Sequence, residues 1–323
     1  MADQLIEKYA ELFSDTHGLI KGHEAKVNLK PDAKPIVFKP RRIPLALQDK
    51  VEEELQRLVK ADVLEEVDPS STAIEWASPV VGAVKPTGKI RLCADFKVSI
   101  NKYMCPDDYP LPVFEDLASN LAGGERYTVI DLKDAYLQMQ VEENSRKYLV
   151  IATHKGYFRY KRLPFGVSFA PSKFQRVMEK ILAGIPRVGV MLDDIIATGD
   201  TFDDHLKNVR TVLDRLLSAG LRTQKAKCKW FQEEVLYLGH RISKEGIQPT
   251  AQHLKAIQDM PAPTSIRGAH APLLLPGAAP ASIYSVNVEV KTPHFRGEHH
   301  SPHRHLTRDH SPHCQTPQRH FPQ

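Results

Sequence analysis

The chain has 323 residues, of which 41% are hydrophobic and 26% charged, and its net charge is +5. This composition suits a globular chain with a sizeable core, and the weak positive charge suits a nucleic-acid partner without identifying one. The four cysteines lie far apart with no CxxC pair, which excludes a disulfide framework and a zinc knuckle. Neither a leader nor an apolar run of membrane-spanning length is found, so we expect a soluble, intracellular protein with no membrane partner.

The first elements in chain order are a connector, a helix and a hairpin. Residues 1–39 predict one short amphipathic helix followed by Pro-interrupted extended chain, which we interpret as an N-terminal connector. Residues 46–60 carry apolar side chains at helical spacing on one face. Residues 77–96 consist of short apolar runs interrupted at 85–88 by Lys-Pro-Thr-Gly, which favours a strand, a turn and a second strand.

The middle of the chain alternates strands and helices. Predicted strands and helices follow one another at 126–132, 148–151, 157–162, 170–182, 188–197, 203–219, 230–231 and 235–242. Between Asp131 and His240 the order is strand, helix, strand, strand, helix, strand. This is the βαββαβ layout of an α+β fold, in which helices cover one face of an antiparallel sheet. Many unrelated domains share this layout, so it decides nothing about activity.

The composition changes at about residue 266. Residues 266–323 are dense in Pro and His and lack periodicity, so we expect this tail to be disordered. Its histidines are irregularly spaced and form no paired ligand motif, which argues against an ordered zinc site.

Two acidic sites lie inside apolar strand patterns. Asp131 ends one apolar strand, and Asp193 and Asp194 interrupt the apolar run 188–197. Adjacent aspartates repel one another and are disfavoured inside strands, whereas bound divalent cations such as magnesium would remove that penalty. Taken separately, Asp193-Asp194 could be an ordinary turn and Asp131 a helix cap. The combination is more specific than either part.

At this point the sequence resembles a known family. From about residue 29 to residue 263 it is similar to the reverse transcriptase of gypsy-type LTR retrotransposon polyproteins. The matching segments are WASPVV at 76–81, KIRLCADF at 89–96, DYPLP at 108–112, LPFGV at 163–167 followed by Ala170-Pro171, KAKCKWF at 225–231, and YLGHRIS at 237–243. The resemblance implies a polymerase right-hand fold, with fingers and a βαββαβ palm over residues 40–248. It places the start of a thumb at 249–265, with the thumb largely missing.

The resemblance also implies an activity and its residues. The chain would be an RNA-directed DNA polymerase that adds deoxynucleoside triphosphates to a primer on an RNA or DNA template. Two Mg²⁺ ions would be held by the catalytic carboxylates Asp131, Asp193 and Asp194. The expected nucleotide-binding residues are Lys85, Arg91, Tyr136 and Phe165, and the expected primer grip is Leu238, Gly239 and His240. Oligomeric state is not indicated by the sequence.

Alternatives remain open for several of these residues. Lys85 and Arg91 could belong to an ordinary solvated hairpin, Tyr136 could be a core tyrosine, and the lysines at 225–229 a solvated basic edge. The family usually has Tyr where this chain has Met191, and the similarity stops after residue 263. A catalytically inactive remnant that keeps the fold and weak nucleic-acid binding is therefore the second interpretation.

Overall fold

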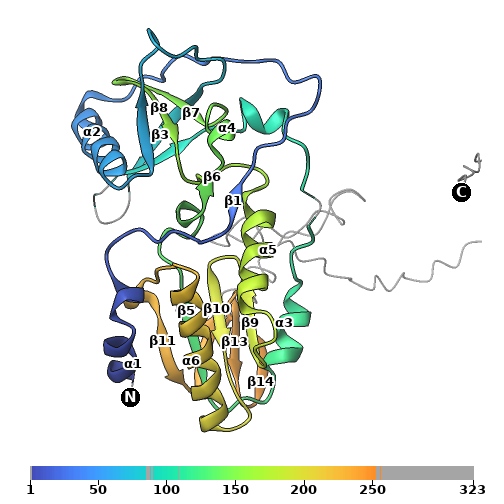
Figure 1. Ribbon diagram of the computed structural model, residues 1–323. Helices are drawn as coiled ribbons and strands as arrows, with labels where there is room; N and C mark the ends of the chain where they lie inside the picture. The colour runs from blue at the N-terminus through green and yellow to red at the C-terminus, as the bar shows by residue number, and fades with distance from the viewer. Residues whose placement is uncertain (1, 85–87, 89, 108, 252–254, 256–323) are drawn as a thin grey trace, which may run out of the picture.

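A computed structural model describes residues 2–84, 88, 90–107, 109–251 and 255 of the chain. Lys85, most of the predicted thumb start and the Pro/His-rich tail lie outside the described residues. Figure 1 shows two main sheets, one above the other, each with its own helices.

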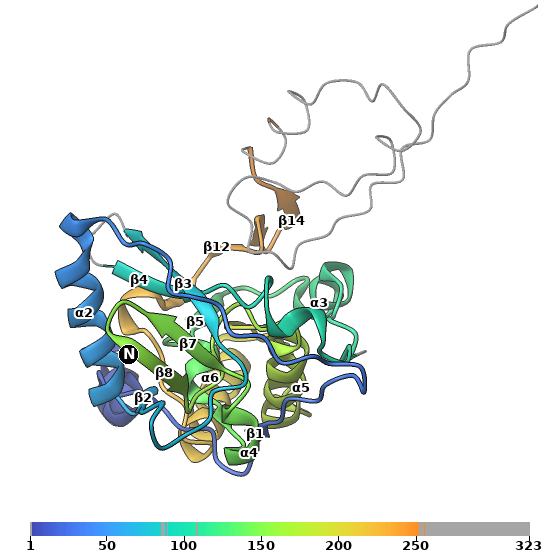
Figure 2. The same cartoon turned by 90° about the horizontal axis from the view of Figure 1, so that it is seen from above.

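The upper sheet has five strands in the order β2-β8-β7-β3-β4. Its strands are β2 (Leu64–Val67), β3 (Ser78–Val84), β4 (Ile90–Ala94), β7 (Val150–Thr153) and β8 (Gly156–Tyr160). Helix α2 (Leu45–Lys60) lies along this sheet, as Figure 2 shows, and buries the apolar face that its sequence predicted: Val51, Leu55 and Leu58. The predicted hairpin at 77–96 is the antiparallel pair β3 and β4.

The lower sheet has four antiparallel strands in the order β11-β5-β10-β9. They are β5 (Tyr127–Asp131), β9 (Val188–Met191), β10 (Asp194–Ala197) and β11 (Lys229–Gln232). Helices α5 (Ala170–Leu182) and α6 (Phe202–Ser218) pack against each other and against this sheet. In chain order these elements are strand, helix, strand, strand, helix, strand, so the predicted βαββαβ unit and the α+β class are confirmed.

The hairpin β7–β8 interrupts this unit in the sequence but not in space. It pairs with β3 and β2 of the upper sheet, and its fully buried strand β7 lies between β3 and β8. The chain therefore leaves the lower sheet after β5 and returns to it through α5.

Local signals account for the ends of the two helices. Proline occupies the first turn of α5, where its missing N–H costs no helical hydrogen bond. The hydroxyl of Thr201 accepts a hydrogen bond from the backbone N–H of Asp204 at 3.2 Å and caps α6. Helix α6 ends before Gly220, whose φ of 81° is the left-handed conformation that glycine adopts readily.

A third, three-stranded meander lies beside β5. Its strands are β12 (Glu234–Tyr237), β13 (His240–Ser243) and β14 (Gly246–Pro249), in sequential antiparallel order. The hydroxyl of Tyr127 on β5 donates to the carbonyl of Ser243 at 3.1 Å. Buried side chains of the meander, β5 and β10 form one apolar cluster with helix α3 (Phe114–Leu121).

The N-terminal segment is packed into the lower part of the molecule. It contains α1 (Ala2–Lys8) and η1 (Ala10–Phe13), and it buries Leu5, Tyr9 and Leu12. The hydroxyl of Tyr9 donates to Asp214 of α6 at 2.7 Å. Residues 1–39, which we interpreted as a connector, therefore contribute to the core.

The remaining elements are short. They are β1 (Glu24–Ala25), β6 (Gln140–Val141), α4 (Glu143–Arg146), η2 (Ile100–Lys102), η3 (Ala135–Gln138) and η4 (Lys225–Lys227). Within the described residues, every helix is too short or too polar to cross a membrane.

Candidate active site

Strand pairing brings the acidic residues together. Strands β5 and β10 are antiparallel, and Asp131 lies directly opposite Asp194. Side chains of directly opposed residues point to the same face, with Cβ atoms about 4.5–5.5 Å apart. Asp193 lies in the two-residue turn between β9 and β10, and its carbonyl accepts a hydrogen bond from the N–H of Leu132 at 3.1 Å. Asp193 thus occupies a turn, as the simpler interpretation had it, whereas Asp194 begins β10, and both lie next to Asp131.

The carboxylates disfavour one another's charge. Burial raises the pKa of Asp194 to about 6, and the negative charges of Asp193 and Asp131 add to the shift. Burial also raises the pKa of Asp131, whereas Lys227 acts in the opposite direction. Hard oxygen ligands that repel one another are a donor set that fits a divalent cation such as Mg²⁺.

Lys227 of η4 already contacts one of these carboxylates. Its ammonium nitrogen lies 3.2 and 3.3 Å from the two carboxylate oxygens of Asp131. Among the described residues, no three His, Cys, Asp or Glu side chains surround a common point that an ion could occupy. An ion bound at Asp131 would compete with Lys227 for these carboxylate oxygens.

The turn that carries Asp193 has an unfavourable backbone conformation. Leu192 has a φ of 55°, a region that non-glycine residues rarely adopt. Its N–H donates to Oε1 of Gln175 at 2.7 Å, and Nε2 of Gln175 donates to the carbonyl of Val190 at 2.9 Å. We did not single out Gln175 from the sequence, although it is the one polar residue among the buried positions of α5.

Three of the four predicted nucleotide-binding residues lie together. The guanidinium of Arg91, on the exposed side of β4, is 4.6 Å from the ring centroid of Phe165. The rings of Phe165 and Tyr136 are 4.9 Å apart. Burial, followed by the charge of Asp193, raises the pKa of Tyr136, so the charge of Asp193 acts on this aromatic cluster. Lys85, the fourth, is not among the described residues.

Two of the predicted primer-grip residues, Leu238 and Gly239, form the turn between β12 and β13, and the third, His240, begins β13. Leu238 and Gly239 have φ values of 47° and 79°, as in a type I′ hairpin turn, which accounts for the glycine. The ring of His240 stacks on Phe114 of α3, with centroids 3.9 Å apart. The neighbouring Tyr237, which sequence reasoning missed, donates its hydroxyl to the carbonyl of Asp194 at 3.2 Å.

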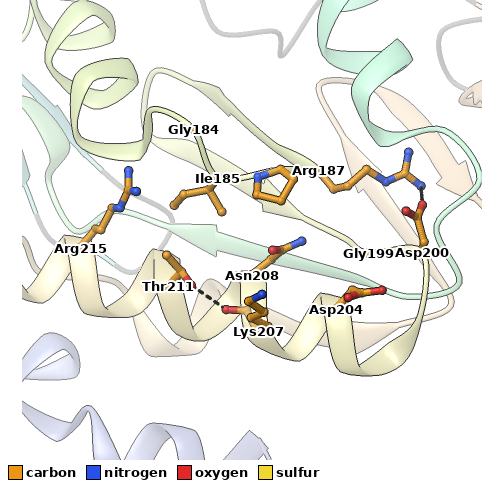
Figure 3. Close-up of a pocket in the computed structure, with 11 residues that line it drawn as sticks. Gly184, Ile185, Arg187, Gly199, Asp200, Asp204, Lys207, Asn208, Thr211 and Arg215 are labelled. Carbon is orange, nitrogen blue, oxygen red and sulfur yellow. Dashed lines mark hydrogen bonds and ion pairs between the residues drawn. The ribbon is translucent and has the colours of Figure 1, made fainter.

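A cavity of about 360 Å³ lies at the opposite end of the β9–β10 hairpin from the carboxylates. Figure 3 shows its lining between the segment before β9 and helix α6, with an ion pair of 2.9 Å between Arg187 and Asp200. Because Arg187 precedes β9 and Asp200 follows β10, the cavity is separate from the acidic turn.

A βαββαβ sheet with carboxylates on adjacent strands, joined to a separate five-stranded sheet, is the palm and fingers of a right-hand polymerase fold. The chain belongs to the family described as “Reverse transcriptase (RNA-dependent DNA polymerase)”, which it matches over residues 83–242.

Relatives and solved structures agree with this assignment. The chain is 38% identical over 258 residues to an uncharacterized protein of Caenorhabditis elegans, covering 79% of this chain and 20% of that protein. It is 30% identical over 245 residues to the retrovirus-related Pol polyprotein from transposon 297 of Drosophila melanogaster, covering 75% and 23% of the two chains. The foamy viral protease-reverse transcriptase in complex with an RNA/DNA hybrid shares the fold, with a TM-score of 0.70 at 21% identity over 83% of this chain and 36% of that one.

The chain therefore spans about a fifth of the length of these curated relatives. The predicted family is confirmed at the level of reverse transcriptases, and the narrower gypsy type stays a prediction.

Proposed function

We propose that the chain is the fingers and palm of an RNA-directed DNA polymerase that extends a primer with deoxynucleotides. The observation that carries this proposal is the direct pairing of Asp131 with Asp194, next to Asp193 in the turn. The family match and the retrotransposon relative support the same activity. The RNA/DNA hybrid bound by the foamy viral enzyme supports a nucleic-acid partner.

Residues at different places in the fold are assigned different roles in the proposed reaction. Two magnesium ions bound by Asp131, Asp193 and Asp194 would activate the primer 3′-hydroxyl and stabilise the pyrophosphate leaving group. Arg91 presents its positive charge to the triphosphate from the fingers sheet. The ring of Tyr136, packed against Phe165, limits the room for a ribose 2′-hydroxyl. The turn at Leu238 and Gly239 would hold the primer end near β10, to which the preceding residue Tyr237 is hydrogen-bonded.

Primer extension on a poly(rA) template with an oligo(dT) primer tests the activity. We expect the wild-type chain to incorporate dTTP and Asp193→Asn to lose about a hundredfold or more in rate, because one metal-binding charge is removed. The matched control is Asp200→Asn, which removes an exposed carboxylate at the other end of the same hairpin. Its rate should stay within about twofold of wild type. Equal background incorporation by all three chains contradicts the proposal.

The substrate class has its own test. Tyr136→Ala should increase the incorporation of ribonucleotides relative to deoxynucleotides by about tenfold or more, because the ring no longer fills the space beside Phe165. An unchanged ratio would assign Tyr136 to the core rather than to nucleotide selection.

A catalytically inactive remnant is the second candidate, and Met191 is the observation that favours it. Met191 ends β9 immediately before the catalytic turn, where the family usually has tyrosine. The remnant would bind an RNA/DNA hybrid but extend no primer. If Met191 causes this loss, Met191→Tyr should restore primer extension. A fully active wild-type chain removes this candidate.

A further inference from the structure

The side chain of Gln175 joins helix α5 to the hairpin that carries two of the carboxylates. We propose that Gln175 is the positioning residue that fixes the Leu192–Asp193 turn and thereby aims Asp193 and Asp194; this inference rests on the proposed function of those carboxylates. Gln175 is fully buried, at 0% exposure, in a helix whose other buried side chains are apolar.

The side-chain amide of Gln175 forms three hydrogen bonds. Oε1 accepts from the N–H of Leu192 at 2.7 Å. Nε2 donates to the carbonyl of Val190 at 2.9 Å and to Oε1 of Glu179 at 2.7 Å. The two backbone contacts lie on either side of Met191, so a single side chain spans the last residues of β9 and the start of the turn.

The Leu192 contact bears on backbone strain. A leucine with a φ of 55° persists only where the surroundings over-determine its conformation. Leu192 is also buried, at 7% exposure, so its N–H would lack a water partner if Gln175 were removed. Gln175 therefore offsets the cost of a turn that places Asp193 and Asp194 toward Asp131.

Glu179, one helical turn further along α5, fixes the orientation of the amide. A carboxylate accepts hydrogen bonds only, so the NH₂ group of Gln175 must face Glu179 and the carbonyl of Val190. Oε1 is then the atom left to face Leu192. The other carboxylate oxygen of Glu179 accepts the hydroxyl of Tyr109, which holds Glu179 in place.

The first test compares Gln175→Met with the control Met178→Leu in the full-length chain. Methionine keeps the volume of glutamine but removes both hydrogen-bonding ends, and Met178 is a buried residue of the same helix whose thioether cannot donate a hydrogen bond to the turn. We expect Gln175→Met to speed hydrogen exchange at the Leu192 amide about tenfold or more and to weaken Mn²⁺ binding about three- to tenfold. Its kcat in primer extension should fall about ten- to a hundredfold, with KM for dTTP changed less than about threefold. If Gln175→Met matches Met178→Leu in exchange and in Mn²⁺ affinity, the inference is overturned.

A second variant pair tests the orientation argument even where Gln175→Met unfolds. Gln175→Glu can still accept from Leu192 but places a second carboxylate against Glu179. Adding Glu179→Gln restores a donor between the two positions, so the double variant should recover protection of the Leu192 amide and Mn²⁺ affinity relative to the single variant. No recovery contradicts the assigned network.

Hydrogen exchange at the Leu192 amide and Mn²⁺ binding are both measured without template or nucleotide, so neither depends on polymerase activity. A wild-type chain that extends no primer, with faster exchange in Gln175→Met, refutes the proposed function and leaves the positioning role standing. A wild-type chain that extends primers, with unchanged hydrogen exchange at the Leu192 amide in Gln175→Met, supports the proposed function and refutes the positioning role.

Discussion

The hydroxyl of Tyr237 donates a hydrogen bond to the backbone carbonyl of Asp194 across 3.2 Å. Tyr237 ends β12, is 2% exposed, and directly precedes the turn at Leu238 and Gly239. This bond joins the hairpin proposed as the primer grip directly to the strand that carries Asp194, one of the proposed catalytic carboxylates.

Tyr237→Phe tests that connection. Removing the hydroxyl deletes one buried hydrogen bond, so the free energy of unfolding should fall by about 1 kcal/mol. Urea denaturation of the full chain measures it, and Tyr157→Phe on the fingers strand β8 is the control. The rate of primer extension by Tyr237→Phe should fall further than its loss of folding stability accounts for. A variant as stable and as active as wild type would show that the contact is incidental.

Lys227→Gln should strengthen binding of divalent cations. The Lys227 ammonium contacts both carboxylate oxygens of Asp131 and so competes with a cation for the same ligand. Because Lys227 is largely exposed, the gain in Mn²⁺ affinity should be modest, about three- to tenfold at pH 8. Titration followed by electron paramagnetic resonance measures it. Lys225→Gln, from the same short helix η4, should change the affinity less, and equal changes in the two variants would contradict the competition.

Asp194→Asn should stabilise the metal-free chain. The pKa of Asp194 is raised from its ordinary value of 3.8 to about 6, so the native state binds more protons than the unfolded chain between these values. The free energy of unfolding therefore falls as pH rises through this window. Asparagine has no such penalty, and at pH 8 the variant should be about 1–3 kcal/mol more stable than wild type in the presence of EDTA. Chemical denaturation at pH 4 and pH 8 checks this, since the difference should vanish at the lower pH.

His205 predicts loss of stability in acid. It is buried in α6, where its ring lies 5.3 Å from that of Phe231, and burial lowers its pKa from 6.5 to about 4. Between these values the unfolded chain binds more protons, so stability is lost as pH falls through the window. Between pH 6.5 and pH 4 the wild-type chain should lose about 2–3 kcal/mol more than His205→Leu, which has no titrating group. Parallel losses in the two chains would assign the acid sensitivity elsewhere.

Much of the fold could be predicted because its signals are local. Helical spacing of apolar residues marked α2, α5 and α6, and apolar runs broken by turn residues marked the hairpins. The acidic residues were conspicuous because aspartate is unusual in buried strands. The same local signals could not tell which sheet β7 and β8 join, since any apolar hairpin can pair with several edges.

The sequence alone determined the order of elements, the reverse transcriptase resemblance and the acidic residues, all of which are encoded within short windows of chain. Only the tertiary structure decided that Asp131 faces Asp194 and that Lys227 contacts Asp131. It also decided that Gln175 hydrogen-bonds to Leu192 and Tyr237 to Asp194. The physical reason is distance along the chain. Strand register and buried hydrogen bonds between segments far apart in sequence depend on how whole faces pack, and no local pattern records that outcome.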